Sequence, residues 1–162
     1  MTSTEEVTLG SSDASSSVEI AATPERVYAL ITDLAVLAEL AEETATMRWV
    51  SGDTAAPGSV FRGANRNGWR RWSTRCTVTA AEPGRCFGFD VVFPPGLPVS
   101  RWQYDLEATP AGCRVTETTW DHRSGLFAAL SGLATGVSDR GQTNAEHIEA
   151  TLARLKARAE SS

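Results

Sequence analysis

The central part of the chain, from residue 46 to about residue 123, consists of strand-like segments separated by turn signals. The separators are Ala56-Pro57-Gly58, Asn67-Gly68, Glu82-Pro83-Gly84, Pro94-Pro95-Gly96 and Thr109-Pro110-Ala111-Gly112. Glycine and proline in such clusters end strands and favour tight turns. Six strands joined in sequence order by short links predict an antiparallel meander, because parallel strands need long crossover connections.

Helical patterns flank the meander on both sides. A strand-like segment at residues 17–21 precedes Thr23-Pro24-Glu25, which has the form of a helix start with Thr23 as N-cap. A second short helix is expected from about Ala35 to Glu43. The segment from about Val137 to Ala159 carries an apolar stripe, which predicts a long amphipathic helix. We therefore expect an α+β fold, an antiparallel sheet wrapped around the long C-terminal helix.

Length and charge limit the possible functions. A chain of 162 residues has the size of one domain, and we expect a disordered tail over residues 1–14 followed by a single domain over residues 15–162. The net charge of -5, from 15 basic and 20 acidic residues, argues against a general nucleic-acid or anionic-membrane binder. Neither a secretory signal nor a membrane-spanning run is recognised, so a cytoplasmic location is expected.

The cysteines and histidines give no metal or nucleophile motif. Cys76, Cys86 and Cys113 are odd in number and lack the close spacing of a zinc site, so we expect free, largely buried thiols. A catalytic cysteine would need a histidine partner, and neither His122 nor His147 stands in a recognisable motif. The sequence predicts no metal and no cofactor.

Hairpin geometry predicts which side chains share a sheet face. A two-residue loop at Pro83-Gly84 gives four pairs of small or apolar residues: Phe87 with Ala80, Phe89 with Val78, Val91 with Cys76 and Phe93 with Thr74. A four-residue loop at residues 109–112 gives three more: Leu106 with Val115, Tyr104 with Glu117 and Trp102 with Thr119. A one-residue bulge would instead turn Thr116, Thr118 and Trp120 inward.

In the first of these registers, Glu117 is a carboxylate on an aromatic face. Burying it is costly unless it is paired, protonated or reserved for a ligand, so it marks a pocket. On the long helix, Asn144 lies at the edge of the apolar stripe beside the small Gly141, as expected for a cavity with few polar contacts. Alternatively, Asn144 and Glu117 hydrogen-bond each other or Arg140.

Several fragments resemble one family. They are Val18-Glu19-Ile20-Ala21-Ala22-Thr23-Pro24-Glu25-Arg26-Val27-Tyr28, Arg75-Cys76-Thr77-Val78, Glu82-Pro83-Gly84-Arg85, Phe87-Gly88-Phe89, Trp102-Gln103-Tyr104-Asp105-Leu106-Glu107, Val115-Thr116-Glu117 and Thr151-Leu152-Ala153-Arg154-Leu155-Lys156. Their order over residues 17–159 resembles the SRPBCC superfamily, also called START-like or helix-grip, in its polyketide cyclase/dehydrase-like branch. The resemblance implies a deep cavity between the sheet and the long helix.

Two functions compete for that cavity. The first is binding of a hydrophobic, aromatic or lipid-like small molecule. Its candidate contacts are Trp72, Cys76, Val78, Phe87, Phe89, Val91, Phe93, Trp102, Tyr104, Glu117, Thr119, Gly141, Asn144 and Ile148. The second is a metal-free cyclase or dehydratase in which Glu117 is the acid or base and Tyr104 the proton donor. Thr119, His122 and Asn144 are secondary candidates.

Two further features of the sequence have more than one interpretation. Arg62, Arg66, Arg70, Arg71 and Arg75 could form a nucleic-acid or acidic-partner surface, but a solvated strand face is the simpler interpretation. The apolar connector Gly125–Gly136 is either a lid or a packing segment. We expect a small-molecule partner, no nucleic acid, no integral membrane contact, and a monomer or homodimer.

Overall fold

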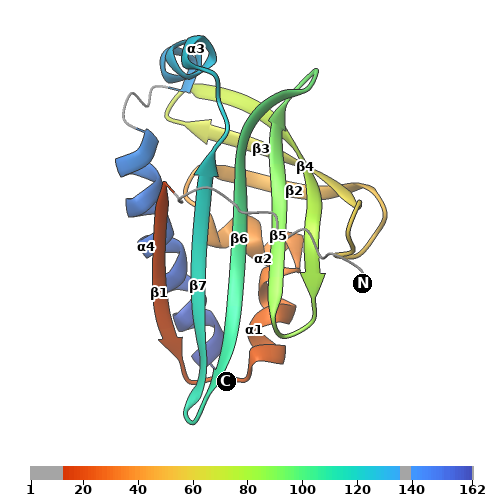
Figure 1. Ribbon diagram of the computed structural model, residues 1–162, viewed down its shortest axis with the longest axis vertical. Helices are drawn as coiled ribbons and strands as arrows, with labels where there is room; N and C mark the ends of the chain where they lie inside the picture. The colour runs from red at the N-terminus through yellow and green to blue at the C-terminus, as the bar shows by residue number, and fades with distance from the viewer. Residues whose placement is uncertain (1–12, 136–139, 162) are drawn as a thin grey trace, which may run out of the picture.

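The computed structural model describes residues 13–135 and 140–161 and shows one antiparallel sheet with helices on its concave side (Figure 1). In chain order the elements are β1 (Ala14–Ile20), α1 (Pro24–Ile31), α2 (Leu34–Leu40), β2 (Thr44–Ser51), β3 (Val60–Asn67), β4 (Arg70–Glu82), β5 (Cys86–Phe93), β6 (Leu97–Thr109), β7 (Gly112–Asp121), α3 (Gly125–Thr135) and α4 (Arg140–Glu160). The strand order β1-β7-β6-β5-β4-β3-β2 confirms the meander, with β1 added beside β7.

The predicted starts of the two short helices are confirmed, and two boundaries differ. The Thr23 side chain accepts a hydrogen bond from the Arg26 amide and caps α1. Helix α2 ends at Leu40, because Ala41 already has an extended backbone. Strand β1 begins at Ala14, three residues before the alternating pattern, while residues 1–12 and Val137 lie outside the described residues.

The segment expected to be a connector forms helix α3 over Gly125–Thr135. It is rich in alanine and leucine, which are strong helix formers. The side-chain oxygen of Ser124 accepts a hydrogen bond from the Phe127 amide, as an N-cap residue does. The segment expected to be either a lid or a packing connector is therefore a regular helix up to Thr135, and Gly136 lies outside the described residues.

The registers explain where the key side chains point. The β6–β7 ladder pairs Tyr104 with Glu117 as predicted, although its loop has two residues because Thr109 pairs with Gly112. In the β4–β5 ladder a bulge between Val78 and Ala80 shifts the pairing, so Phe87 faces Ala81 and not Ala80. That ladder ends at Arg75 and Val92, so Phe93 and Thr74 are not paired.

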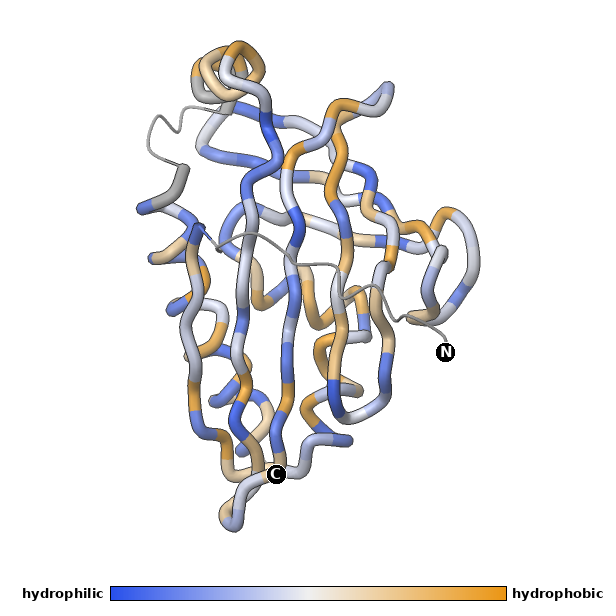
Figure 2. Tube along the Cα trace, in the orientation of Figure 1, coloured by the Kyte–Doolittle hydropathy of each residue, from blue (hydrophilic) through white to orange (hydrophobic). Residues whose placement is uncertain are grey.

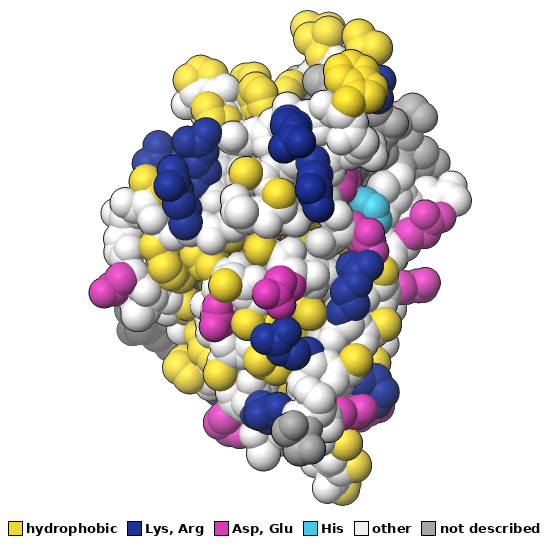
Figure 3. Space-filling model, turned by 180° about the vertical axis from the view of Figure 1, so that it is seen from behind, with side chains coloured by type: hydrophobic (Ala, Val, Ile, Leu, Met, Phe, Trp, Pro, Cys, Tyr) yellow, Lys and Arg dark blue, Asp and Glu magenta, His cyan; other side chains and the backbone are white. Residues whose placement is uncertain are grey.

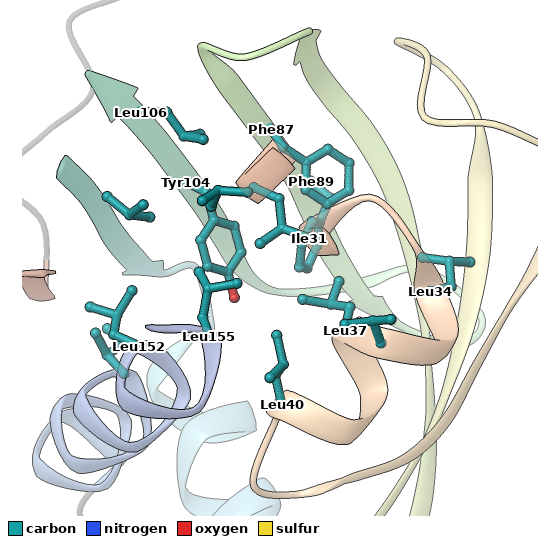
Figure 4. Packing of buried hydrophobic residues seen from close by; sticks show 14 of the residues in the cluster. Ile31, Leu34, Leu37, Leu40, Phe87, Phe89, Tyr104, Leu106, Leu152 and Leu155 are labelled. Carbon is teal, nitrogen blue, oxygen red and sulfur yellow. The ribbon is translucent and has the colours of Figure 1, made fainter. Parts of the chain in front are cut away.

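Helices α1 and α4 close the lower part of the sheet with a dense apolar core. Phe87, Ile31 and Leu155 are completely buried there, and Figure 4 shows them pointing toward one another from strand and helices. Figure 2 shows hydrophobic residues, coloured orange, distributed along both the helices and the strands that form this core. Arg26 of α1 also contacts α4, because its Nε donates a hydrogen bond to the Ala159 carbonyl at 2.8 Å.

Candidate functional site

A cavity of about 560 Å³ lies between the upper part of the sheet, α2, α3 and the first turns of α4. Its wall is largely aliphatic and aromatic, with a few polar groups. The lining residues are Leu37, Ala41, Glu42, Glu43, Thr44, Met47, Gly63, Asn65, Arg71, Trp72, Thr74, Cys76, Phe89, Val91, Phe93, Leu97, Val99, Ser100, Trp102, Tyr104, Glu117, Asp121, Arg123, Phe127, Leu130, Asn144, His147 and Thr151. A cavity of this size and character suits a small apolar molecule.

Most of the residues expected at the site line this cavity. They are Trp72, Cys76, Phe89, Val91, Phe93, Trp102, Tyr104, Glu117 and Asn144. Their side chains converge because inward positions alternate along each strand and the antiparallel registers align the strands.

Four expected contacts lie elsewhere. Val78, Phe87 and Ile148 are buried in the core next to the cavity, because the helices fill the lower part of the fold with side chains. Thr119 is fully buried, and its hydroxyl donates a hydrogen bond to the Arg101 carbonyl at 3.0 Å, so its donor is already used. None of these four lines the cavity.

Two further candidates add nothing to the wall. His122 is exposed at the end of the meander and is not among the lining residues. Gly141 lies in α4, but its surroundings are outside the part of the chain whose side chains the structure describes.

Sequence reasoning missed the walls contributed by α2, β2 and β3. Phe61 is buried, and the period-two alternation from it places Gly63 and Asn65 on the same inward face. Asn65 accepts a hydrogen bond from the Thr44 hydroxyl at 3.2 Å and donates one to the Thr74 hydroxyl at 3.1 Å. Alternation could have found these positions. The sheet curls inward and brings these positions to the cavity, but no local sequence pattern predicts that curvature.

The polar centre of the cavity is the pair Tyr104 and Glu117, whose side chains are almost completely buried. The Tyr104 hydroxyl donates a hydrogen bond to Glu117 Oε1 at 2.8 Å. The second carboxyl oxygen, Oε2, is buried and has no hydrogen-bond partner among the described residues. Asn144 also lines the cavity, and no hydrogen bond to Glu117 is found within the described part of the chain. The Arg140 side chain lies outside it.

Burial sets the protonation of this pair. Loss of water raises the pKa of Glu117 to about 8, and the hydrogen bond from Tyr104 opposes this shift without cancelling it. Burial and the neighbouring carboxyl group raise the pKa of Tyr104 well above its usual value. Near neutral pH, Glu117 is therefore largely a neutral carboxylic acid. It can donate a hydrogen bond to a ligand oxygen, and at higher pH it can accept one.

The cysteines do not supply a nucleophile. All three thiols are free, and burial raises the pKa of both Cys76 and Cys86 to about 12. Thiolates are the reactive form, so these groups are inert near neutral pH. In the described residues, no cluster of three histidine, cysteine or acidic side chains is arranged to hold a metal ion. Tyr104 and Glu117 supply the buried acid–base pair of the cavity, and His147, whose Nδ1 lies 3.4 Å from Glu43 Oε1, also lines it.

A comparison with known protein families agrees with this fold and cavity. A family model described as polyketide cyclase / dehydrase and lipid transport matches residues 12–160. The chain belongs to this family. Among curated proteins, none matches its sequence. No helix in the described part of this family member is long and apolar enough to cross a membrane.

Solved structures show the same fold. The Polyketide_cyc-like protein Cgl2372 from Corynebacterium glutamicum is 27% identical, with a TM-score of 0.64 and 94% of each chain covered. Protein CV1439 from Chromobacterium violaceum is 14% identical, with a TM-score of 0.70 and coverage of 91% of this chain and 97% of that one. The di-domain ARO/CYC StfQ from the steffimycin biosynthetic pathway is 15% identical, with a TM-score of 0.69 and coverage of 90% of this chain and 49% of that one.

Proposed function

We propose that this protein binds a hydrophobic small molecule, aromatic or lipid-like, in the cavity between the sheet and α4. The observation that carries the proposal is the buried Oε2 of Glu117, which has no hydrogen-bond partner among the described residues and lies in a largely apolar wall. A buried polar atom without a partner is unfavourable, and a ligand that supplies the partner relieves that cost. The ligand should therefore combine an apolar body with at least one oxygen or nitrogen.

Apolar burial would supply most of the affinity. Phe89, Val91 and Trp102 form a continuous wall, and removal of apolar surface from water contributes about 25 cal/mol per Å². The Tyr104–Glu117 pair would fix the orientation of the ligand, because Glu117 Oε2 has no partner among the described residues, whereas several other polar groups of the wall are satisfied locally. Trp102 Nε1, for example, donates a hydrogen bond to the Ser100 hydroxyl at 3.0 Å.

A matched pair of substitutions on β5 tests the binding site. Val91 lines the cavity, whereas Val92, next to it, is on the opposite face of the strand. Val91→Trp should fill the cavity and reduce binding of the polarity-sensitive dye Nile red at least about tenfold. Val92→Trp should bind the dye as the unchanged protein does. Equal dye binding by both variants would contradict the proposed site.

The Tyr104–Glu117 pair also favours a second function, metal-free acid–base catalysis of cyclisation or dehydration. A carboxyl group with a pKa near 8 exchanges its proton easily near neutral pH, and the cavity limits the access of water. Glu117 would move the proton, and the Tyr104 hydroxyl would stabilise an oxyanion of the substrate. The family description and the likeness to the di-domain ARO/CYC StfQ support this alternative.

The two proposed functions predict different effects of the substitution Glu117→Gln. In a carrier, this isosteric change should leave the ligand chemically unaltered and change only its affinity. In an enzyme, it should slow the reaction by about a hundredfold or more, because the acid–base group is gone. Mass analysis of the ligand after incubation with each protein separates the cases. Turnover at an unchanged rate in the variant would rule out Glu117 as the catalytic acid or base.

A further inference from the structure

Exposed apolar side chains gather at the mouth of the cavity. Seven large hydrophobic side chains are exposed among the described residues, and six of them lie on α3 and on the β3–β4 and β5–β6 hairpins. These six are Trp69, Phe93, Leu97, Leu126, Leu130 and Leu133. Phe93, Leu97 and Leu130 also line the cavity, so the apolar wall continues onto the surface. We call these six residues the apolar rim.

The helix α3 presents its leucines outward. Leu126, Leu130 and Leu133 follow the spacing of one helical face, and the exposed fractions of Leu126 and Leu133 are 75% and 77%. Phe127 anchors the helix from the other side, with its ring centroid 6.1 Å from that of Phe93. Such a contiguous patch of exposed apolar side chains marks an interaction surface in a monomeric protein.

Positive charge is concentrated on the outer face of β2, β3 and β4 and at the adjoining cavity mouth, where Arg71 also lines the cavity. Arg62 lies directly opposite both Arg48 and Arg75, one on each neighbouring strand, and Arg66 lies opposite Arg71. All five are exposed, and none forms an ion pair within the described part of the chain. We call these five residues the arginine belt.

The arrangement of the arginine belt does not stabilise the fold. Like charges directly opposite each other on a sheet are destabilising. Asp90, on the same face, accepts two hydrogen bonds from Arg101 at 2.6 and 3.0 Å. Glu42 and Glu43 share a surface hollow with Arg66 and Arg71, but Glu42 pairs with Arg154 and Glu43 lies beside His147. In a chain with a net charge of -5, a local group of five exposed arginines without an ion pair among the described residues indicates an anionic partner.

The rim and the belt lie at the same end of the molecule. Figure 3 shows apolar side chains gathered at the upper end, with two groups of basic side chains in the band directly beneath them. An apolar tip above a basic band matches the cross-section of a bilayer, in which the acyl region lies beneath anionic headgroups. A nucleic acid would engage the belt but leave the exposed leucines in water.

We propose that the end of the protein that carries the cavity mouth docks on a bilayer containing anionic phospholipid. The leucines of α3 enter the acyl boundary, and the arginine belt contacts the lipid phosphates. Trp69, with the Arg70 guanidinium 4.5 Å from its ring centroid, sits at the headgroup level that tryptophan favours. An apolar ligand could then pass between the bilayer and the cavity without crossing water.

Vesicle flotation with the full chain tests this docking surface. The unchanged protein should float with vesicles of equimolar phosphatidylcholine and phosphatidylglycerol and remain largely unbound with phosphatidylcholine alone. The double variant Leu126→Ser, Leu133→Ser should bind at least about tenfold more weakly, because less apolar surface is buried. The double variant Arg62→Gln, Arg75→Gln should bind about thirtyfold more weakly, and high salt should have a similar effect on the unchanged protein.

Two controls match these changes outside the surface. Ala153→Ser makes an exposed position on the C-terminal half of α4 polar, and Arg85→Gln removes an exposed arginine at the β4–β5 hairpin. Both should bind vesicles as the unchanged protein does. Absence of vesicle binding, equal binding by all variants, or self-association through α3 would overturn the proposal. Because no cavity ligand is needed, failure here is distinguishable from failure of the dye-binding test.

Discussion

The two halves of α4 pack against very different surroundings. Its C-terminal half buries Leu152, Leu155 and Ala159 against a filled apolar core. Its N-terminal half presents Asn144 and His147 to the cavity. The same contrast occurs on β5, where Phe87 is enclosed in the core while Phe89, two residues further along, borders open space. Stability is therefore concentrated at one end of the fold and the potential ligand site at the other.

The contrast arises from side-chain size and polarity. At the filled end, α1 and α4 meet the sheet with large aliphatic side chains such as Ile31 and Leu155. At the hollow end, the inward positions include the small or polar Gly63, Thr74 and Ser100, which cannot reach across the gap. A fold can tolerate the unfavourable burial of Glu117 at one end because the dense core at the other end offsets it.

The largest expected effect is on the free energy of unfolding. It compares the same substitution, phenylalanine to alanine, at the filled end and at the hollow end of β5. Phe87→Ala should lower the free energy of unfolding by about 3–5 kcal/mol, because it creates a cavity in a filled core. Phe89→Ala should cost roughly half as much, since one side of its ring already faces open space. Denaturant unfolding of both variants measures the difference. Equal losses would mean that the two ends are packed alike.

The next effect is the pH dependence that Glu117 creates. Burial raises its pKa from 4.5 to about 8, so between these values the folded protein retains a proton that the unfolded chain has lost. The contribution of Glu117 to the free energy of unfolding should therefore fall as pH rises through that window, by about 1.4 kcal/mol per pH unit at most. The Glu117→Gln variant should lack this decline and be the more stable protein at pH 8.

Unfolding curves of both proteins across that pH range provide the measurement. The difference between them isolates Glu117, since all other titrating groups are shared. A constant difference at every pH would show that the carboxyl group titrates normally and is accessible to water.

The smallest expected effect concerns the hydroxyl of Tyr104. Tyr104→Phe removes the 2.8 Å hydrogen bond and leaves Glu117 Oε1 without its donor, which should cost about 1–2 kcal/mol. The same hydrogen bond lowers the pKa of Glu117, so the variant should extend the decline in stability to higher pH. Unfolding at several pH values tests both effects, and a pKa of Glu117 that stays in place would refute the coupling.

Local patterns were sufficient to predict much of this fold. The spacing of the turn signals predicted the meander, and the hairpin at residues 109–112 predicted that Glu117 faces Tyr104. The bulge in β4 was not predictable, because nothing in the residues around Thr79 distinguishes an extra residue from a regular ladder. The boundary between filled core and cavity was also missed. It depends on how far α1 and α4 extend over the sheet, which is why Phe87 and Ile148 were expected at the site.

The most direct test of the ligand cavity is native mass spectrometry of the protein taken gently from its source cell extract. We expect a bound small molecule that is apolar and carries a hydrogen-bonding oxygen or nitrogen, and we expect it to be lost in the Val91→Trp variant but retained in Val92→Trp. A molecule retained equally in both variants would contradict the account, because it would be bound outside the cavity that contains Tyr104 and Glu117.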